Sequence, residues 1–404
     1  MNPRLDTLKP YPFERLNKLK EGIVVRSNAP HVAFSIGEPR HDPPGFVIDA
    51  LADRSMLLDT LKGYPATKGT DTLRESMAAW LKLRFGSDVD AGAGVLPVSG
   101  TREALFSFGQ AIVGKKANPV VISPNPFYQI YEGSALLAGA EPVFADTVAA
   151  NNFQPDFSRI TEEMWKRTEL VYLCSPGNPT GKIVDPATQR WLIEQAHRYD
   201  FVIASDECYS EIYPDEARPH PGLLTISNEM GNPDYARCVV FHSLSKRSNL
   251  PGLRSGFVAG DAQVLKQYYQ YRTYQGCAMG LHTQKASEIA WRDETHVVAN
   301  RALYQQKFEA VVPLLEDHLS FTLPDGGFYL WAQTPIDDET YAMRLYQDLN
   351  ITVLPGSYLS RENHGADPGR GFVRIALVAP VSECVEAATR IGHWHKEQFG
   401  ESLT

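Results

Sequence analysis

The sequence predicts an α/β protein built on a mostly parallel sheet, followed by a smaller α+β unit. Two observations favour the parallel sheet: short apolar runs alternate with helical patterns, and polar residues gather directly after each run. A length of 404 residues exceeds the size at which one core stops growing, so two domains are expected. The runs are 119–122, 170–174, 201–204 and 238–241.

The segment before these runs predicts one amphipathic helix. Residues 70–86 carry apolar side chains at helical spacing, with Thr70 or Asp71 as the N-cap and Gly86 as the stop signal. In the loop before this helix, Tyr64 is either a packing residue or a donor to a ligand.

A second helix follows the apolar run 95–98 and the small residues Ser99, Gly100 and Thr101. The first backbone N–H groups of a helix are unpaired and its dipole is positive there, so this junction suits an anion. A plain N-terminal cap explains the same residues, and both interpretations stay open at this point.

The second half of the chain has fewer polar clusters. Residues 256–260 are expected to form one more strand, and a long helical region at about 284–316 is expected to connect two domains. We expect residues 1–40 to join the small domain, 41–299 to form the large domain and 300–404 to form the small one. Strands of the smaller unit are expected at 326–331, 351–357 and 372–378.

Composition argues against several function classes. A net charge of -9 and a pI near 5.7 disfavour nucleic acid or an anionic membrane as the main partner. No run has the roughly 18 apolar residues of a membrane span, and the first residues do not resemble a signal peptide, so we expect a cytoplasmic protein. The five cysteines include no C-x-x-C pair and are expected to be reduced, mostly buried thiols.

Three weaker motifs carry little information. Residues 109–115 nearly match a P-loop, but they lie at a helix end and Lys116 replaces the Ser or Thr. Gly92 and Gly94 lack the third glycine of a dinucleotide fingerprint. We interpret His393 and His395 as solvated helix residues rather than as metal ligands.

Lys246 stands out because of where it lies. Ligands of open α/β sheets bind at the carboxyl ends of the strands, so the polar clusters after the four runs are expected to converge. An isolated lysine at a strand end is more often an ordinary surface residue, but in such a cleft it can form a Schiff base with a carbonyl group. The clusters are 123–128, 175–181, 205–209 and 243–246.

Together these clusters resemble the class I/II aminotransferases among the fold-type-I pyridoxal phosphate (PLP) enzymes. The motifs S-P-x-N-P-T-G, S-D-E-x-Y, S-L-S-K and R-S-G occur in the order and spacing of that family, between Ile36 and Arg374. The resemblance implies a large domain with a mostly parallel seven-stranded sheet covered by helices, a smaller α+β domain, and a homodimer with shared active sites. It also implies PLP as cofactor and amino-acid and 2-oxo-acid substrates.

The resemblance assigns the catalytic roles to Lys246, Asp206 and Tyr209. Lys246 matches the lysine that forms the Schiff base with PLP and then moves the proton. Asp206 matches the carboxylate that keeps the pyridine nitrogen protonated. Asn178 and Tyr209 match the donors to the phenolic oxygen of the cofactor.

The family's remaining binding positions are also present. Arg374 matches the arginine that pairs with the substrate α-carboxylate, and Gly37 and Asn178 match residues beside it. Without the family, Arg374 is either turned to solvent or aimed at a carboxylate. The cofactor is expected to contact Gly100, Thr101, Arg102, Ser243, Ser245 and Arg254. Of these, Gly100, Thr101, Ser243 and Arg254 match the family's phosphate site, together with Tyr64 from the neighbouring subunit.

The aromatic residue that stacks on the cofactor has three candidates. The segment directly after Pro124 and Pro126 offers Phe127, Tyr128 and Tyr131. We favour Tyr128, with Phe127 next.

Longer strings resemble the bacterial N-succinyldiaminopimelate aminotransferases of lysine biosynthesis. This resemblance implies amino transfer between glutamate and N-succinyl-2-amino-6-oxopimelate in a ping-pong cycle. Nothing in the spacing identifies the residues for the distal end of that substrate; Arg102, Arg272 and Tyr274 are candidates. The strings are 124–133, 205–213, 243–249 and 271–274.

Three alternatives share the same motifs. A broad-specificity aspartate, aromatic or alanine-type aminotransferase and a PLP lyase acting at Cβ would use every cofactor residue named above. A non-catalytic regulator of this fold usually carries a DNA-binding module, and the chain has no spare length or basic segment for one.

Overall fold

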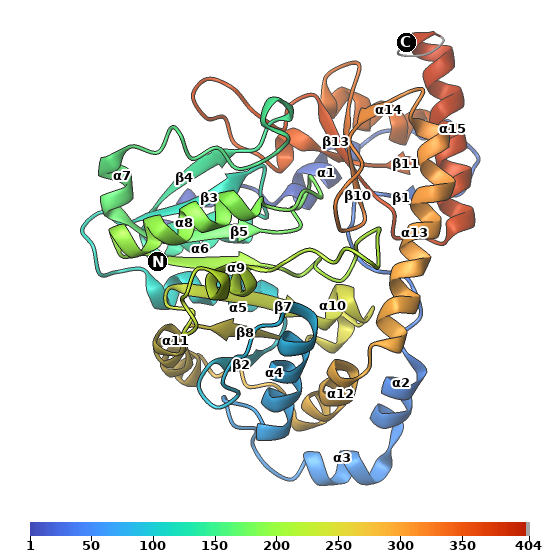
Figure 1. Cartoon of the computed structure of the whole chain (residues 1–404). Helices are drawn as coiled ribbons and strands as arrows, with labels where there is room; N and C mark the ends of the chain where they lie inside the picture. Colours follow the sequence, from blue (N-terminus) through green and yellow to red (C-terminus); the bar gives the residue numbers. More distant parts are fainter. Residues whose placement is uncertain (401–404) are drawn as a thin grey trace.

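A computed structural model describes residues 1–400 and contains a large sheet of seven strands (Figure 1). The strand order is β2-β8-β7-β6-β5-β3-β4, and β8 is antiparallel to both of its neighbours while the other pairs are parallel. The prediction of an α/β fold with a mostly parallel seven-stranded sheet is confirmed. The strands are β2 (Val95–Val98), β3 (Val120–Asn125), β4 (Glu141–Asp146), β5 (Thr168–Cys174), β6 (Val202–Asp206), β7 (Cys238–Ser243) and β8 (Gly256–Gly260).

Helices cover both faces of this sheet because successive side chains of each strand enter opposite cores. In β5, Val171 and Leu173 pack into one core, whereas Leu170 and Tyr172 pack into the other. Both cores are completed by apolar helix faces (Figure 1). The first core contains side chains of α4 (Asp71–Phe85), α8 (Pro186–Tyr199), α9 (Leu223–Glu229) and α12 (Leu281–Arg292). The second contains side chains of α5 (Thr101–Ile112), α6 (Ile130–Ala138) and α11 (Ala262–Gln275).

The helix predicted at 70–86 is α4, and its caps follow the sequence signals. Thr70 Oγ1 accepts a hydrogen bond from the backbone N–H of Leu73, and Gly86 ends the helix in the left-handed region with φ of 66°. Strand β4 has no clear sequence signal because it lies at the edge of the sheet, and Ala145 is its one fully buried residue.

A second, antiparallel sheet lies in the upper right part of Figure 1 with the order β12-β13-β10-β9. The short strand β1 (Val32–Ala33) pairs with β11 (Ile351–Thr352), so the N-terminal segment packs against the C-terminal part. The sheet consists of β9 (Ser320–Phe321), β10 (Tyr329–Gln333), β12 (Leu354–Pro355) and β13 (Phe372–Ala376). The helices beside it are α13 (Thr295–Leu315), α14 (Asp338–Leu349) and α15 (Val381–Phe399).

The helical connection expected at 284–316 is two helices rather than one. Helix α12 ends at Arg292 and α13 begins at Thr295, with a break at Asp293 and Glu294. The predicted domain boundary between residues 299 and 300 lies inside α13, and the three domain ranges stay a prediction.

The remaining helices are short. None of the helices within residues 1–400 is both long and apolar enough to cross a membrane. They are α1 (Pro12–Lys20), α2 (Gly45–Ala52), α3 (Arg54–Thr60), α7 (Glu162–Arg167) and α10 (Leu244–Arg247), with single 3-10 turns at Pro3–Thr7, Ala149–Asn151, Pro251–Leu253 and Gly356–Tyr358.

The interpretation of His395 as a solvated residue is wrong, although His393 is exposed as expected. His395 is 3% exposed, and its Nε2 lies 2.6 Å from the hydroxyl oxygen of Tyr341. Burial lowers the pKa of His395 to about 4, with a smaller contribution from His318. His395 lies on the buried face of α15 beside Ile391 and Trp394, and the spacing of the two histidines does not reveal which of them is on that face.

We predict that His395→Gln makes the stability of the protein less sensitive to acid. Between pH 6.5 and about 4 the unfolded chain binds a proton at this position and the folded chain does not, so stability falls as the pH falls through that window. Urea unfolding at several pH values between 5 and 7 should give a slope shallower by up to about 1.4 kcal/mol per pH unit in the variant. His393→Gln is the exposed control, and equal slopes in both variants would contradict the prediction.

Candidate active site

A cleft of about 600 Å³ lies where the carboxyl ends of the large sheet face the smaller sheet and the N-terminal segment. The strand ends therefore converge as the sequence predicts. Two predicted residues do not line the cleft: Gly100, which lies against Arg254, and Tyr64, which is fully exposed in this chain. The predicted residues that line it are Gly37, Thr101, Arg102, Tyr128, Asn178, Asp206, Tyr209, Ser243, Ser245, Lys246, Arg254 and Arg374.

Lys246 lies on α10, one turn after β7 ends. Its Nζ donates a hydrogen bond to the backbone oxygen of Gly37 at 2.9 Å. Burial lowers the pKa of Lys246 to about 8, and the positive charges of Arg374 and Arg254 act in the same direction. A larger fraction of neutral amine is therefore present near neutral pH than for an exposed lysine.

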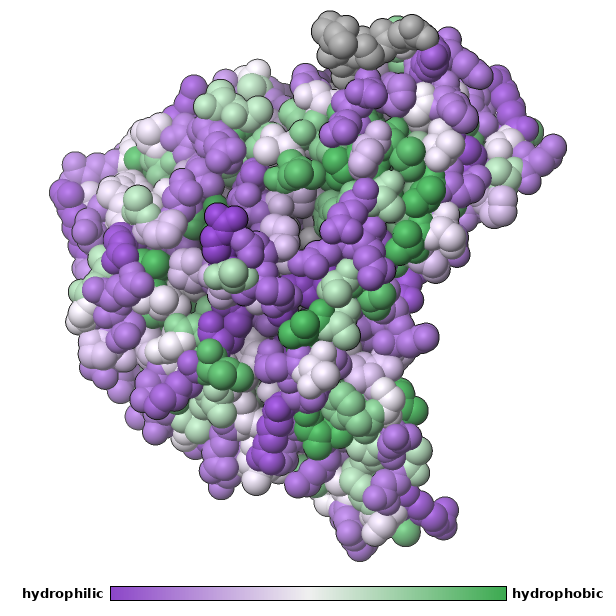
Figure 2. Space-filling model, turned by 45° about the vertical axis from the view of Figure 1, so that its right-hand side comes forward, coloured by the Kyte–Doolittle hydropathy of each residue, from purple (hydrophilic) through white to green (hydrophobic). Residues whose placement is uncertain are grey.

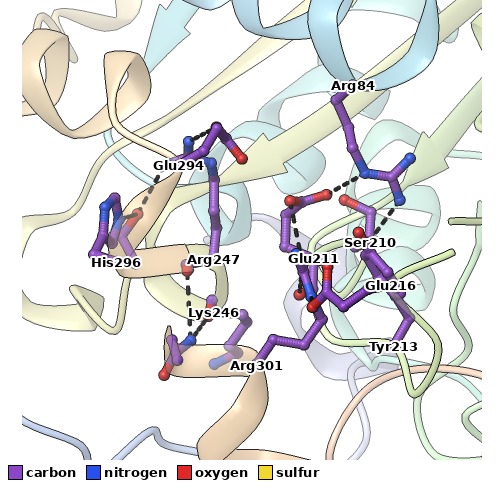
Figure 3. Close-up of polar contacts among 12 residues, drawn as sticks. Arg84, Ser210, Glu211, Tyr213, Glu216, Lys246, Arg247, Glu294, His296 and Arg301 are labelled. Carbon is purple, nitrogen blue, oxygen red and sulfur yellow. Dashed lines mark hydrogen bonds and ion pairs between the residues drawn. The ribbon is translucent and has the colours of Figure 1, made fainter. Parts of the chain in front are cut away.

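The turn that carries Lys246 is held by contacts with the end of α12, with the break between α12 and α13, and with α13. Arg247 donates to the backbone oxygen of Ala290 at 2.8 Å and forms an ion pair with Glu294 (Figure 3). The side-chain amide of Asn300 donates to the backbone oxygen of Lys246 at 3.1 Å. The lysine backbone is therefore anchored to both helices.

The segment after β6 is held by a second group of charged residues. Arg84 from α4 and Arg301 from α13 approach Glu211 from two sides (Figure 3). Arg84 Nε lies 2.7 Å from Glu211 Oε1, and Arg301 donates to the backbone oxygen of Glu211 at 2.7 Å. These contacts fix the chain two residues beyond Tyr209, which lines the cleft.

Asp206 is the last residue of β6 and is buried. Its Oδ2 accepts a hydrogen bond from the hydroxyl of Tyr131 at 2.7 Å, and its Oδ1 accepts one from the backbone N–H of Cys208 at 3.3 Å. Burial raises the pKa of Asp206. Hydrogen bonds from the Cys208 side chain, from the Tyr131 hydroxyl and from the Cys208 backbone oppose that effect.

Gly37 is required by the close approach of a tyrosine from the smaller sheet. A Cβ at Gly37 would lie 1.9 Å from the hydroxyl oxygen of Tyr329. That oxygen lies 2.8 Å from the hydroxyl oxygen of Tyr209. The two tyrosines connect the segment after β6 with β10 across the cleft.

Arg374 of β13 is 4% exposed and spans three parts of the chain. Its guanidinium donates to Asn178 Oδ1 at 2.8 Å and to the backbone oxygen of Ser35 at 2.6 Å, and it lies 4.4 Å from the centroid of the Tyr329 ring. Its Nε is buried without a hydrogen-bond partner, and no carboxylate within residues 1–400 forms an ion pair with it. The side chain is therefore turned into the cleft and not to solvent.

The start of α5 faces Arg254. Gly100 is the N-cap with φ of 84°, and a Cβ there would lie 2.2 Å from a terminal nitrogen of Arg254. The hydroxyl oxygens of Ser243 and Ser245 are 2.9 Å apart at the cleft wall. Unpaired helix N–H groups, two hydroxyls and a guanidinium form a donor set that suits a phosphate.

Of the three aromatic candidates, Tyr128 alone lines the cleft. Phe127 is buried against Phe144, with ring centroids 5.1 Å apart. Tyr131 stacks on Tyr172 with centroids 4.8 Å apart, below Asp206.

The structure does not support Arg272 and Tyr274 as contacts for the distal end of a substrate. Both belong to α11 rather than to a loop. Arg272 is 1% exposed and forms an ion pair with Glu103 at 2.8 Å, and Tyr274 is 88% exposed away from the cleft. Arg102 does line the cleft, where its guanidinium lies over the ring of Tyr11 at 5.2 Å.

The lining residues that sequence reasoning missed include Tyr11, Glu38, Cys208 and Tyr329. Cys208 and Glu38 adjoin predicted residues in the sequence, so their positions next to the motifs could have identified them as candidates. Tyr11 and Tyr329 come from distant segments whose place in the cleft depends on the packing of the smaller sheet.

Comparisons with known proteins agree with this geometry. LL-diaminopimelate aminotransferase from Nitratidesulfovibrio vulgaris (strain DP4) is 30% identical over 392 residues, which cover 96% of this chain and 97% of that protein. The crystal structure of an aminotransferase from Neisseria meningitidis Z2491 is 48% identical with a TM-score of 0.93 and covers 98% of this chain and 100% of that one. An aminotransferase from Helicobacter pylori 26695 is 34% identical with a TM-score of 0.88, covering 97% and 100%.

The family model described as "Aminotransferase class I and II" matches residues 29–391. Enzymes of this family depend on PLP, which they bind as a Schiff base to a lysine, and they act on amino acids and 2-oxo acids. The matched range contains every cleft residue discussed above except Tyr11. The chain belongs to the class I and II aminotransferases.

Proposed function

We propose that this aminotransferase is a succinyldiaminopimelate transaminase. It transfers the amino group of N-succinyl-LL-2,6-diaminopimelate to 2-oxoglutarate, giving N-succinyl-2-amino-6-oxopimelate and glutamate. Three cleft arginines, Arg102, Arg254 and Arg374, form no ion pair with a carboxylate in the described part of the chain. Since Arg254 is assigned to the phosphate, the observation that carries this proposal is the presence of the other two, Arg374 and Arg102. Such a cleft suits a substrate with a carboxylate at each end.

The similarity to relatives named LL-diaminopimelate aminotransferases supports a substrate with the diaminopimelate skeleton. LL-Diaminopimelate itself is therefore the second candidate. The longer sequence strings around Tyr128, Cys208 and Lys246 favour the succinylated form.

The residues of the cleft fit PLP. When bound, PLP withdraws electrons from the α-carbon of the substrate amino acid. Its phosphate fits the start of α5 at Gly100 and Thr101, with Ser243, Ser245 and Arg254. A side chain at Gly100 would fill the space that Arg254 occupies, so the close packing of this cup depends on the glycine. Tyr128 would cover the ring, and Asp206 would hold a proton on the pyridine nitrogen.

Lys246 is the base that takes the proton from the α-carbon of the substrate. Its pKa of about 8 keeps a substantial fraction of the amine neutral near neutral pH. The hydrogen bond from Nζ to the backbone oxygen of Gly37 orients the amine within the cleft.

Arg374 orients the substrate through its α-carboxylate. Its Nε has no partner, and its two terminal nitrogens are held by Asn178 and Ser35. The guanidinium is therefore already in position, and binding does not have to order a flexible side chain. Asn178 and Tyr209 complete the polar wall beside it.

We also propose a homodimer in which Tyr64 reaches the phosphate site of the neighbouring subunit. Tyr64 is fully exposed and lies outside its own cleft. It follows α2 and α3, which expose Phe46, Ile48, Leu58 and the adjoining Leu61, and Figure 2 shows apolar surface on this projecting lobe. An apolar patch of this kind suits a subunit interface.

We predict that the pH dependence of the rate of PLP uptake follows the pKa of Lys246. Only the neutral amine attacks the PLP aldehyde, so the rate constant for PLP uptake by the apoenzyme should rise roughly tenfold per pH unit and level off above about 8. Stopped-flow absorbance of the bound cofactor measures this rate. Lys246→Ala should show neither the visible absorption nor amino transfer. A rate that keeps rising beyond pH 10 would contradict the lowered pKa.

A donor panel tests the substrate. With 2-oxoglutarate as acceptor, we expect kcat/KM for N-succinyl-LL-diaminopimelate to exceed that for aspartate, tyrosine and alanine by about 100-fold or more. Alanine and tyrosine have no second carboxylate, and the second carboxylate of aspartate lies much closer to the α-carbon than that of the succinylated substrate. A preference for unmodified LL-diaminopimelate would replace the proposal by the second candidate. Release of ammonia and pyruvate from cystathionine without a 2-oxo acid would indicate a Cβ-lyase.

We predict that Arg102→Gln weakens binding of the distal carboxylate. kcat/KM for N-succinyl-LL-diaminopimelate should fall about 10- to 100-fold, mainly through KM, because a charged hydrogen bond is lost. The basal rate with alanine, which has no distal carboxylate, should stay within about threefold. Equal losses with both donors would show that Arg102 does not contact the distal carboxylate.

A further inference from the structure

The carboxylate of Asp206 is hydrogen-bonded to Tyr131, which stacks on Tyr172. Neither tyrosine lines the cleft. Tyr131 and Tyr172 are fully buried and stacked, with an interplanar angle of 15°. The two hydroxyls have different partners. Tyr131 donates to Asp206 Oδ2 at 2.7 Å, whereas Tyr172 donates to the backbone oxygen of Leu105 at 2.7 Å.

We propose that Tyr131 is a positioning residue for Asp206: its hydroxyl keeps the carboxylate ionised and in one orientation at the floor of the cleft. This inference rests on the proposed contact between Asp206 and the pyridine nitrogen of PLP. Tyr131 itself touches neither cofactor nor substrate, because it does not line the cleft.

The hydrogen bonds to Asp206 support this role. A buried carboxylate without donors takes up a proton, and a protonated Asp206 cannot hold a second proton on the pyridine nitrogen. Asp206 also receives hydrogen bonds from the side chain and the backbone N–H of Cys208. The backbone contact is long, at 3.3 Å, whereas the bond from the Tyr131 hydroxyl is 2.7 Å. A phenol also donates along one direction only, which fixes the rotation of the carboxylate.

The packing of Tyr131 makes its direction rigid. Its ring lies between Tyr172 and Tyr128, with centroids 4.8 Å and 5.8 Å away. Tyr128 is the aromatic residue that faces the cleft. Tyr131 therefore connects two residues of the proposed cofactor site, one through its ring and one through its hydroxyl.

Tyr131→Phe tests the proposal because it removes one hydroxyl and keeps the ring. We expect the dissociation constant for PLP, measured by titrating the apoenzyme, to rise about tenfold. kcat should fall by a similar factor or more, with KM for the amino donor unchanged within about threefold. Tyr172→Phe is the matched control, since it removes the hydroxyl of the stacked partner and should leave both constants within about threefold of the wild type. Equal effects in the two variants, or none in Tyr131→Phe, would overturn the proposal.

Two amino acids of similar size at position 131 separate hydrogen bonding from packing if Tyr131→Phe does not fold. Tyr131→4-aminophenylalanine keeps a donor and should bind PLP within about threefold of the wild type. Tyr131→4-methylphenylalanine has no donor and should bind about tenfold more weakly. Equal PLP affinity in these two variants would overturn the proposal.

Asp206→Asn distinguishes this inference from the proposed function. If Asp206→Asn changes neither PLP affinity nor kcat, the assigned role of Asp206 fails and the role of Tyr131 fails with it. If Asp206→Asn impairs both and Tyr131→Phe impairs neither, the inference alone fails. If Asp206 and Tyr131 both have the roles proposed here, the two residues act as one unit. Tyr131→Phe should then change PLP affinity by less than a further threefold in the Asp206→Asn background. If the effects of the two substitutions on the free energy of PLP binding were fully additive, the proposed coupling between Tyr131 and Asp206 would be overturned.

Discussion

Arg374 is the constraint on which the cleft depends. A buried guanidinium without a carboxylate is costly, and the oxygens of Asn178 and Ser35 compensate only part of that cost. Those two oxygens come from the loop after β5 of the large sheet and from the N-terminal segment, while Arg374 itself belongs to the smaller sheet. One side chain therefore joins the three parts of the chain and leaves its positive charge facing the cleft. In the proposed function, the α-carboxylate of the substrate supplies the missing negative charge, so the side chain that joins the three parts of the chain also selects the ligand.

The turn at Lys246 is fixed by a similar use of buried charge. Arg247 follows the lysine directly and points the opposite way, toward Glu294 in the break between α12 and α13. Because α13 continues into the smaller sheet region, the position of the lysine and the position of Arg374 are coupled through one helix. Arg301, on the same helix, holds the segment that contains Tyr209. Buried ion pairs contribute little net stability, but breaking one is costly, and this favours a single arrangement of the site.

The sequence predicts strand ends better than it predicts what packs against them. Asp206, Lys246 and Asn178 follow apolar runs, and the rule that ligands bind at the carboxyl ends of parallel strands places them together. Tyr131 was assigned as a possible stacking residue because periodicity gives no direction for a side chain at a helix start, and the structure turns it beneath Asp206. Arg272 was considered for the substrate because its pairing with Glu103, 169 positions away, is invisible without the fold. Tyr11 and Tyr329 depend on how the smaller sheet packs, which no local pattern encodes.

Burial acts on Lys246 and Asp206 in opposite directions, and both shifts favour the neutral form. For the lysine this is useful, since the neutral amine is the nucleophile and the base. For the aspartate it is harmful, since only the anion can hold a proton on a pyridine nitrogen. The two residues share one cleft, so a change in the solvent exposure of that cleft would favour the required form of one residue and disfavour that of the other. Local hydrogen bonds resolve the conflict: Asp206 receives donors from Tyr131 and Cys208, whereas Lys246 Nζ has one acceptor, the backbone oxygen of Gly37, among its described hydrogen bonds. In the proposed mechanism, the hydroxyl of Tyr131 therefore helps to keep Asp206 ionised in the same cleft in which Lys246 must be neutral.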